Sequence, residues 1–140
     1  MKLSKIIAVD FDGTIVENAY PKIGKPRLFA FETLKKLQNQ GYRLTLWTYR
    51  SGKSLEEAVE FCKENGVEFY AVNNSFEGEE FDHEEQSRKI NADIFVDDRN
   101  VGGFPGWGEV YDCITRRKTL DFDKAERKKR QRKKSFYFWF

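Results

Sequence analysis

The sequence predicts an α/β fold with a doubly wound parallel sheet in a single domain, and three observations lead to this prediction. Short apolar runs alternate with segments of helical spacing along residues 5–114. Glycine stands at the end of two of the helical segments, where it favours termination. The 140 residues are the size of one domain, and no apolar run approaches the roughly 20 residues that span a bilayer.

The first run, "KIIAVD" at residues 5–10, is predicted as a buried strand because its centre is continuously apolar. Residues 27–41 have helical spacing and end at Gly41, so we expect a helix there. Residues 42–48, "YRLTLWT", are expected to form the second strand. The side chains that the helix is expected to place in the core are Leu28, Phe29, Phe31, Leu34 and Leu37.

Residues 54–66 predict a second helix, with Ser54 as the N-cap of a capping box closed by Glu57 and with Gly66 at the end. Strand and helix would then continue to alternate, as in a doubly wound sheet. The remaining segments are interpreted as a third strand at 67–72, a polar stretch with a short helix at 73–89, a fourth strand at 92–97 and a fifth strand at 109–114.

Charge divides the chain into a body, residues 1–115, and a basic tail, residues 116–140. The tail holds eleven Lys or Arg against three acids, whereas the body holds fourteen basic and twenty acidic residues. Cys62 and Cys113 lie in apolar patterns without metal-ligand spacing, which favours buried, reduced thiols and a cytoplasmic location. The body and the tail are therefore expected to have different roles.

Several functions fit the tail, and the sequence leaves them open. Its density of Lys and Arg favours binding of nucleic acid or another polyanion, with an affinity that falls as salt rises. Its last five residues, "FYFWF", could stack on bases, anchor at a membrane interface or dock on a partner subunit. A solvated extension without such contacts is the alternative.

Polar side chains stand beside the ends of the predicted strands, where ligands bind in open parallel sheets. Several carboxylates gathered at one edge would repel one another unless a cation lay between them, and oxygen ligands favour Mg²⁺. The residues concerned are Asp10, Asp12 and Gly13 after the first strand, Thr48 and Arg50 after the second, Asn73 and Asn74 after the third, Lys89 before the fourth, and Asp97 and Asp98 after it.

These residue types suit phosphoryl transfer. A carboxylate attacks phosphorus once cations cancel the charge of the phosphoryl oxygens, and a second acid two residues later can protonate the leaving group and then activate water. Gly13 would let the backbone bend so that both Asp10 and Asp12 reach one site. Thr48 and Lys89 would hold the remaining phosphoryl oxygens.

The segment "DFDGT", Thr48, Lys89 and the pair "DD" at 97–98 resemble, in order, the four motifs of the haloacid dehalogenase (HAD) superfamily phosphatases. The resemblance covers residues 5–114. It implies that Asp10 is the nucleophile that forms an aspartyl-phosphate and that Asp12 is the general acid/base. It also implies that Thr48 is the hydroxyl of the second motif and Lys89 the cation of the third.

The same resemblance implies a Mg²⁺ ion held by the Asp10 carboxylate, the main-chain carbonyl of Asp12 and the Asp98 carboxylate. Asp97 would support this set from behind. Neither gap between the motifs has room for the cap domains that this superfamily inserts, so the chain resembles an uncapped (C0) member. An uncapped site must be shielded from water by loops, a large substrate or a second subunit, which favours a homo-oligomer.

Arg50, Asn73 and Asn74 are candidate substrate contacts. Arg50 could instead pair with a nearby acid, and the two asparagines could instead be turn formers. The function predicted from the whole pattern is a Mg²⁺-dependent phosphomonoester hydrolase that acts on a small phosphate ester or a phosphorylated macromolecule. A nucleic-acid-binding adaptor with an inactive hydrolase body is the alternative, and phosphotransfer to an acceptor other than water would use the same residues.

Overall fold

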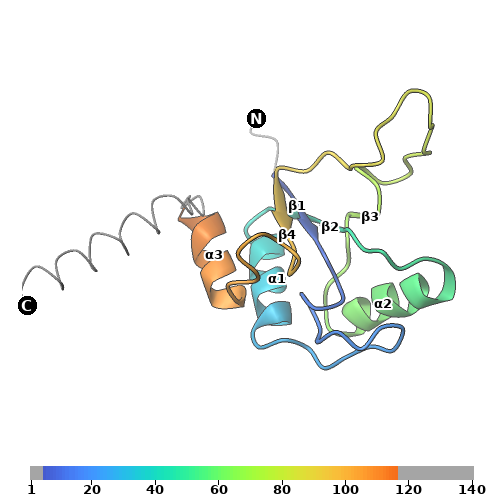
Figure 1. The fold of residues 1–140 in the computed structure, drawn as a ribbon. Coiled ribbons are helices and arrows are strands. Elements are labelled where there is room, and N and C mark those ends of the chain that lie inside the picture. The colour runs from blue at the N-terminus through green and yellow to red at the C-terminus, as the bar shows by residue number, and fades with distance from the viewer. Residues whose placement is uncertain (1–4, 117–140) are drawn as a thin grey trace, which may run out of the picture.

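The structure, a computed structural model, describes residues 5–116, and Figure 1 shows strands and helices alternating along this part of the chain. The basic tail predicted for residues 116–140 lies, apart from Arg116, outside the described residues. The elements are β1 (Ile6–Val9), α1 (Ala30–Asn39), β2 (Arg43–Leu46), α2 (Gly52–Glu64), β3 (Ala71–Val72), β4 (Ile94–Val96) and α3 (Trp107–Thr115).

The four strands form one sheet in the order β3-β2-β1-β4, and all three neighbouring pairs are parallel. Val9 of β1 pairs with both Leu46 of β2 and Val96 of β4, and Leu46 pairs in turn with Val72 of β3. These four residues therefore form one row across the sheet, and each strand ends at it. The predicted parallel sheet is confirmed, and every residue that follows this row lies at one edge.

The core lies between one face of the sheet and the helices. Ile7 and Val9 of β1 and Leu44 and Leu46 of β2 are fully buried and belong to one cluster with side chains of α1, α2 and α3. Phe61 of α2 meets Phe31 of α1 edge-on, with ring centroids 5.9 Å apart. The connections β1-α1-β2 and β2-α2-β3 move along the sheet in the same direction. Because parallel crossovers share one handedness as a rule, we infer that α1 and α2 cover the same face.

The helix expected within residues 73–89 is wrong, because this segment contains only turns and bends. In Figure 1 it forms a loop that leaves β3 and extends away from the sheet before returning to β4. Since α3 packs on α1, the three helices of residues 5–116 share one face. The described residues therefore show an all-parallel α/β sheet, whereas a doubly wound sheet needs helices on both faces.

The fifth strand expected at 109–114 is also wrong, because these residues lie within α3. Trp107, Val110 and Ile114 are its buried residues, and their separations of three and four positions are those of one helical face. The run "EVYDCI" is too short for its apolar pattern to distinguish a strand from a helix. The structure thus contains four strands within the described part of the chain.

Three further expectations about the helices are corrected. The second helix begins at Gly52 with Ser51 as N-cap and no side-chain cap hydrogen bond, while Ser54 lies inside the helix and donates to the Ser51 carbonyl. Leu28 and Phe29 are 77% and 57% exposed, so neither belongs to the core. Phe29 is the left-handed residue before α1, with φ of 64°, and this turn directs it out of the helical face.

Two further expectations concern the burial of the cysteines and membrane-spanning helices. Cys62 is a buried free thiol whose pKa is raised to about 12 by burial, whereas Cys113 is only half-buried. Within residues 5–116, none of the helices combines the length and the apolar character needed to cross a bilayer.

Candidate active site

The register of the sheet brings the sequence-predicted acids to one edge. Asp10 and Asp97 directly follow the paired residues Val9 and Val96, and the Asp10 backbone N–H donates to the Val96 carbonyl at 3.0 Å. Asp98 comes next along the chain. Residues that are 87 positions apart in sequence therefore become neighbours because two adjacent parallel strands, β1 and β4, end together.

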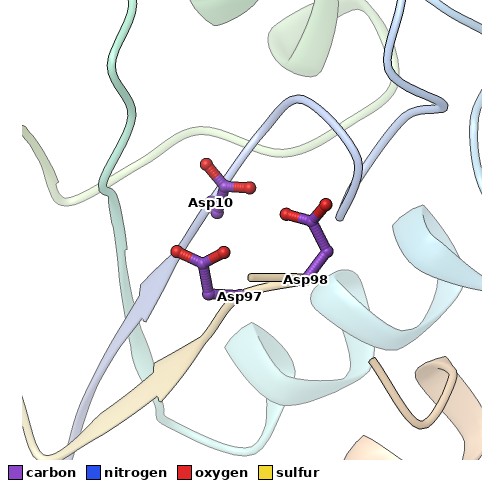
Figure 2. A group of neighbouring side chains, drawn as sticks. All are labelled: Asp10, Asp97 and Asp98. Atoms are coloured by element: carbon purple, nitrogen blue, oxygen red, sulfur yellow. The ribbon is translucent and has the colours of Figure 1, made fainter. Parts of the chain in front are cut away.

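Asp10, Asp97 and Asp98 form an acidic cluster in which one carboxylate oxygen of each lies within 4.8 Å of the others. Figure 2 shows the three carboxylate groups around a common space, with Asp10 at the end of β1 and the other two after β4. All three side chains are half-buried. Three hard oxygen donors at this spacing fit a small divalent cation such as Mg²⁺.

Asp10 is strongly perturbed by this environment. Burial is the largest cause, and the hydrogen bond with Asp98 and the negative charge of Asp97 act in the same direction, so that the pKa of Asp10 rises from 3.8 to about 8. The hydrogen bond from Thr14 opposes this shift in part. Without a cation the cluster therefore holds a proton at neutral pH, and a bound cation would take the place of that proton.

Thr14, the last residue of "DFDGT", joins the two sides of the cluster. Its hydroxyl oxygen lies 2.9 Å from Asp10 Oδ2 and 3.2 Å from Asp98 Oδ1, and it accepts a hydrogen bond from the Asp98 backbone N–H at 2.9 Å. The Trp107 indole N–H donates to the Thr14 carbonyl at 2.8 Å, and Trp107 is 2% exposed. Sequence reasoning assigned no role to Thr14, although it stands inside the quoted motif.

Gly13 is required where the backbone turns beneath the cluster, whereas its expected role of bringing both Asp10 and Asp12 to one site stays a prediction. Its φ is +88°, a left-handed conformation that favours glycine, and a Cβ there would lie 2.7 Å from Asp98 Cγ. The Gly13 carbonyl also accepts a hydrogen bond from Arg27 Nε at 2.6 Å. The absence of a side chain therefore lets Asp98 approach the loop that follows β1.

Asp12 is not one of the three acids of the acidic cluster, and its side chain is held by Arg50. The Arg50 Nε and Nη2 groups donate to the two Asp12 carboxylate oxygens, both at 2.7 Å. The Arg50 side chain is fully buried, whereas that of Asp12 is 15% exposed. The hydrogen bonds to Asp12 raise the pKa of Arg50 above its usual value. Of the two readings considered for Arg50, the structure favours pairing with an acid.

Thr48 and Asn73 meet at the same edge, beyond β2 and β3. Asn73 Oδ1 accepts the Thr48 backbone N–H at 2.8 Å, and Asn73 itself adopts a left-handed φ of 54°. The Thr48 hydroxyl accepts the Arg50 backbone N–H at 3.2 Å, so its own proton is available to donate elsewhere. Asn73 thus holds the Thr48 loop in place, while half-buried Asn74 has no side-chain hydrogen bond within residues 5–116.

Lys89 does not join the acidic cluster in this structure. It lies in the exposed loop before β4, and its ammonium group is 5.3 Å from the centre of the Phe95 ring. The groups that shift the pKa of Asp10 are acids and Thr14, and no lysine is among them. The role of Lys89 as the cation of the third motif stays a prediction.

Comparisons with known proteins identify a solved structure that is similar to this chain, without naming an activity. No protein-family model matches the chain, and no curated protein matches it. A solved structure of a conserved protein from Bacteroides thetaiotaomicron is 52% identical to it, with a TM-score of 0.79, and the match covers 84% of this chain and 95% of that one. The two chains belong to one family, and the description of the solved structure states no function.

Proposed function

From its membership in the family of this Bacteroides protein and from its own side chains, we propose that the chain is a Mg²⁺-dependent phosphomonoester hydrolase that acts through an aspartyl-phosphate. The observation that carries the proposal is the acidic cluster at the carboxyl edge of the sheet. There, Asp10 combines a strongly raised pKa with two neighbouring carboxylates. The resemblance of "DFDGT" and the 97–98 pair to HAD phosphatase motifs supports the same chemistry.

The donor set fits the metal that the proposal requires. Asp10 and Asp98, which follow β1 and β4, would hold Mg²⁺ together with the main-chain carbonyl of Asp12, while the neighbouring Asp97 would support this set. The ion, when bound, neutralises charge on the phosphoryl oxygens. Asp10 would then be held as a carboxylate, which is the form that attacks phosphorus.

The chain's own groups would complete two displacements. In the first displacement, an Asp10 carboxylate oxygen would form a bond to phosphorus as the bond from phosphorus to the leaving oxygen breaks. Asp12 would donate its proton to that leaving oxygen. A water oxygen then attacks the same phosphorus, Asp12 receives the water proton, and the carboxylate of Asp10 is restored as phosphate departs. The Thr48 hydroxyl has a free proton to donate to a phosphoryl oxygen. Lys89 would contact a phosphoryl oxygen only after a movement of the loop that carries it.

Residues 5–116 contain only a loop and α1 between β1 and β2, and α2, β3 and a loop between β2 and β4. These connections offer no second domain to close over the acidic cluster. The proposed site would therefore be open, and both a small phosphate ester and a phosphorylated macromolecule fit this architecture. Release of inorganic phosphate, measured beside transfer to an added alcohol, distinguishes hydrolysis from phosphotransfer.

The test uses Asp10→Asn with Asp112→Asn as the matched control, because the Asp112 side chain on α3 is 44% exposed and its one ion pair within residues 5–116 is with Arg116. An aryl phosphate or an acyl phosphate is the suitable substrate, since its leaving group is stable as an anion. Asp10→Asn is expected to abolish turnover and the hydroxylamine-sensitive phosphoenzyme, Asp112→Asn to retain both, and a chelator to stop the wild-type enzyme. Full activity of Asp10→Asn with Mg²⁺ would refute the mechanism.

A further inference from the structure

Arg50 has no donor left for a substrate. A guanidinium group carries five N–H bonds, and the structure gives Arg50 five hydrogen bonds. Two go to the Asp12 carboxylate, and the other three go to main-chain carbonyl oxygens at 2.8–3.1 Å. Those carbonyls belong to Pro21, Lys22 and Ser54. A buried cation that is fully paired in this way is a fixed structural element, because any loss of a partner leaves an uncompensated donor.

Two aromatic rings also pack against the same guanidinium. The guanidinium carbon lies 5.0 Å from the centre of the Phe11 ring and 5.3 Å from that of the Tyr20 ring. Aromatic rings at this distance attract a cation and restrict its rotation. Arg50 therefore presents Asp12 with a rigid, planar pair of donors rather than with a flexible charge.

Asp12 keeps acceptor capacity toward the open side. The Asp12 carboxyl group has about four lone-pair positions, and the two bonds from Arg50 use one on each oxygen, so a position is left at which the acid form carries the proton for the leaving oxygen. The remaining positions lie on a side chain that is 15% exposed. The orientation of the Asp12 carboxylate at the sheet edge is thus set by Arg50, while part of it stays accessible.

The backbone of Arg50 acts on the second candidate group. Its N–H donates to the Thr48 hydroxyl at 3.2 Å, and its carbonyl lies 3.5 Å from Asn73 Nδ2. One residue thereby fixes Asp12 through its side chain and Thr48 through its main chain. No other described residue has hydrogen bonds to both of these side chains.

We propose that Arg50 is the positioning residue of the active site, which holds the Asp12 carboxylate toward the leaving oxygen without touching the substrate. This inference rests on the proposed phosphatase function. It assigns to Arg50 a role other than the anion binding expected from its place after β2. It also predicts that replacing Arg50 slows the reaction more when the leaving group must be protonated in order to depart.

The experiment compares wild type, Arg50→Lys and Arg116→Lys on an alkyl phosphate and an aryl phosphate with Mg²⁺. Lysine cannot reproduce two parallel hydrogen bonds, so Arg50→Lys should lower kcat for the alkyl phosphate by about 10²–10⁴-fold, the usual range of general acid-base catalysis. The aryl phosphate should lose far less, and KM should stay near the wild-type value for both. Arg116→Lys, at the exposed C-cap of α3, should change the turnover of neither substrate.

A double-mutant cycle tests whether Arg50 acts through Asp12. On an Asp12→Asn background, Arg50→Lys should cause little further loss of kcat, because the group that it positions is already gone. Where Arg50→Lys does not fold, Tyr20→Leu provides the second variant, since Tyr20 is 50% exposed and packs on the guanidinium. Tyr20→Leu should lower kcat for the alkyl phosphate by about two- to fivefold and should lower kcat for the aryl phosphate less.

The outcomes separate this inference from the proposed function. Equal losses on the two substrates, a raised KM at unchanged kcat, or full additivity with Asp12→Asn would overturn the positioning role. So would wild-type rates of Tyr20→Leu on both substrates where that variant replaces Arg50→Lys. Each of these results leaves the phosphatase proposal intact if Asp10→Asn is inactive. A wild-type protein that turns over neither ester would instead remove the proposed function.

Discussion

The raised pKa of Asp10 makes the stability of the metal-free protein depend on pH in an unusual direction. The folded-state pKa of about 8 lies above the ordinary value of 3.8, so between these two pH values the folded protein binds a proton that the unfolded chain has released. The free energy of unfolding must therefore fall as pH rises through this window. Most carboxylates that gain partners on folding have the opposite effect, because their pKa is lowered.

The size of this effect has an upper limit. One proton changes the unfolding free energy by at most about 1.4 kcal/mol per pH unit. Asp10 is only half-buried, so solvent screening reduces the penalty. We expect the titration of Asp10 to lower the free energy of unfolding by about 1–2 kcal/mol as the pH rises from about 5 to about 7.

The assay is urea unfolding of wild type and Asp10→Asn with a chelator at several pH values across that window. The difference between the two proteins isolates the one group, since the other titrating residues are shared. Wild type should lose stability relative to Asp10→Asn as pH rises, and saturating Mg²⁺ should reverse the trend, because a cation that replaces the proton binds better at higher pH. A difference that is independent of pH would show that Asp10 is not buried among acids.

Three other predictions concern the loop after β1 and the tail. Gly13→Ala should lower the free energy of unfolding by about 1–2 kcal/mol, because alanine disfavours the left-handed backbone at this position. The new Cβ should also displace Asp98, so calorimetry should detect no Mg²⁺ binding, and a wild-type affinity for Mg²⁺ would contradict the geometry. Thr14→Val should cost about 1–3 kcal/mol in urea unfolding, because the Asp98 N–H loses its acceptor, and unchanged stability would contradict that hydrogen bond. Replacing Lys and Arg of residues 117–134 by Gln should flatten the salt dependence of RNA binding, and equal binding of both proteins at all salt concentrations would exclude a polyanion-binding tail.

The acidic cluster could be anticipated because parallel strands place whatever follows them at one edge. The apolar runs before Asp10 and Asp97 identified two strands, and the short segments that follow them carried the acids. The pairing of Val9 with Val96 then brings the two acids together without further information. Position along the strands was therefore enough to predict this part of the site.

The partner of Arg50 could not be predicted from spacing. The sequence placed Arg50 near the same edge, but its side chain can turn toward solvent or toward the core. The choice depends on Phe11, Tyr20 and three carbonyl oxygens, which only the folded chain assembles. The conformation of the loop that carries Lys89 could not be predicted either, because a polar segment without hydrophobic periodicity does not indicate how it folds.

Trp107 gives the molecule an optical reporter next to the proposed chemistry. Its buried indole is hydrogen-bonded to the main chain of Thr14, whose hydroxyl bridges Asp10 and Asp98. Any ligand that shifts the loop after β1, which contains Thr14, alters the surroundings of the Trp107 indole. With Trp47 and Trp139 replaced by phenylalanine, the emission of one tryptophan would follow occupancy of the acidic cluster in real time, with no label and no turnover required.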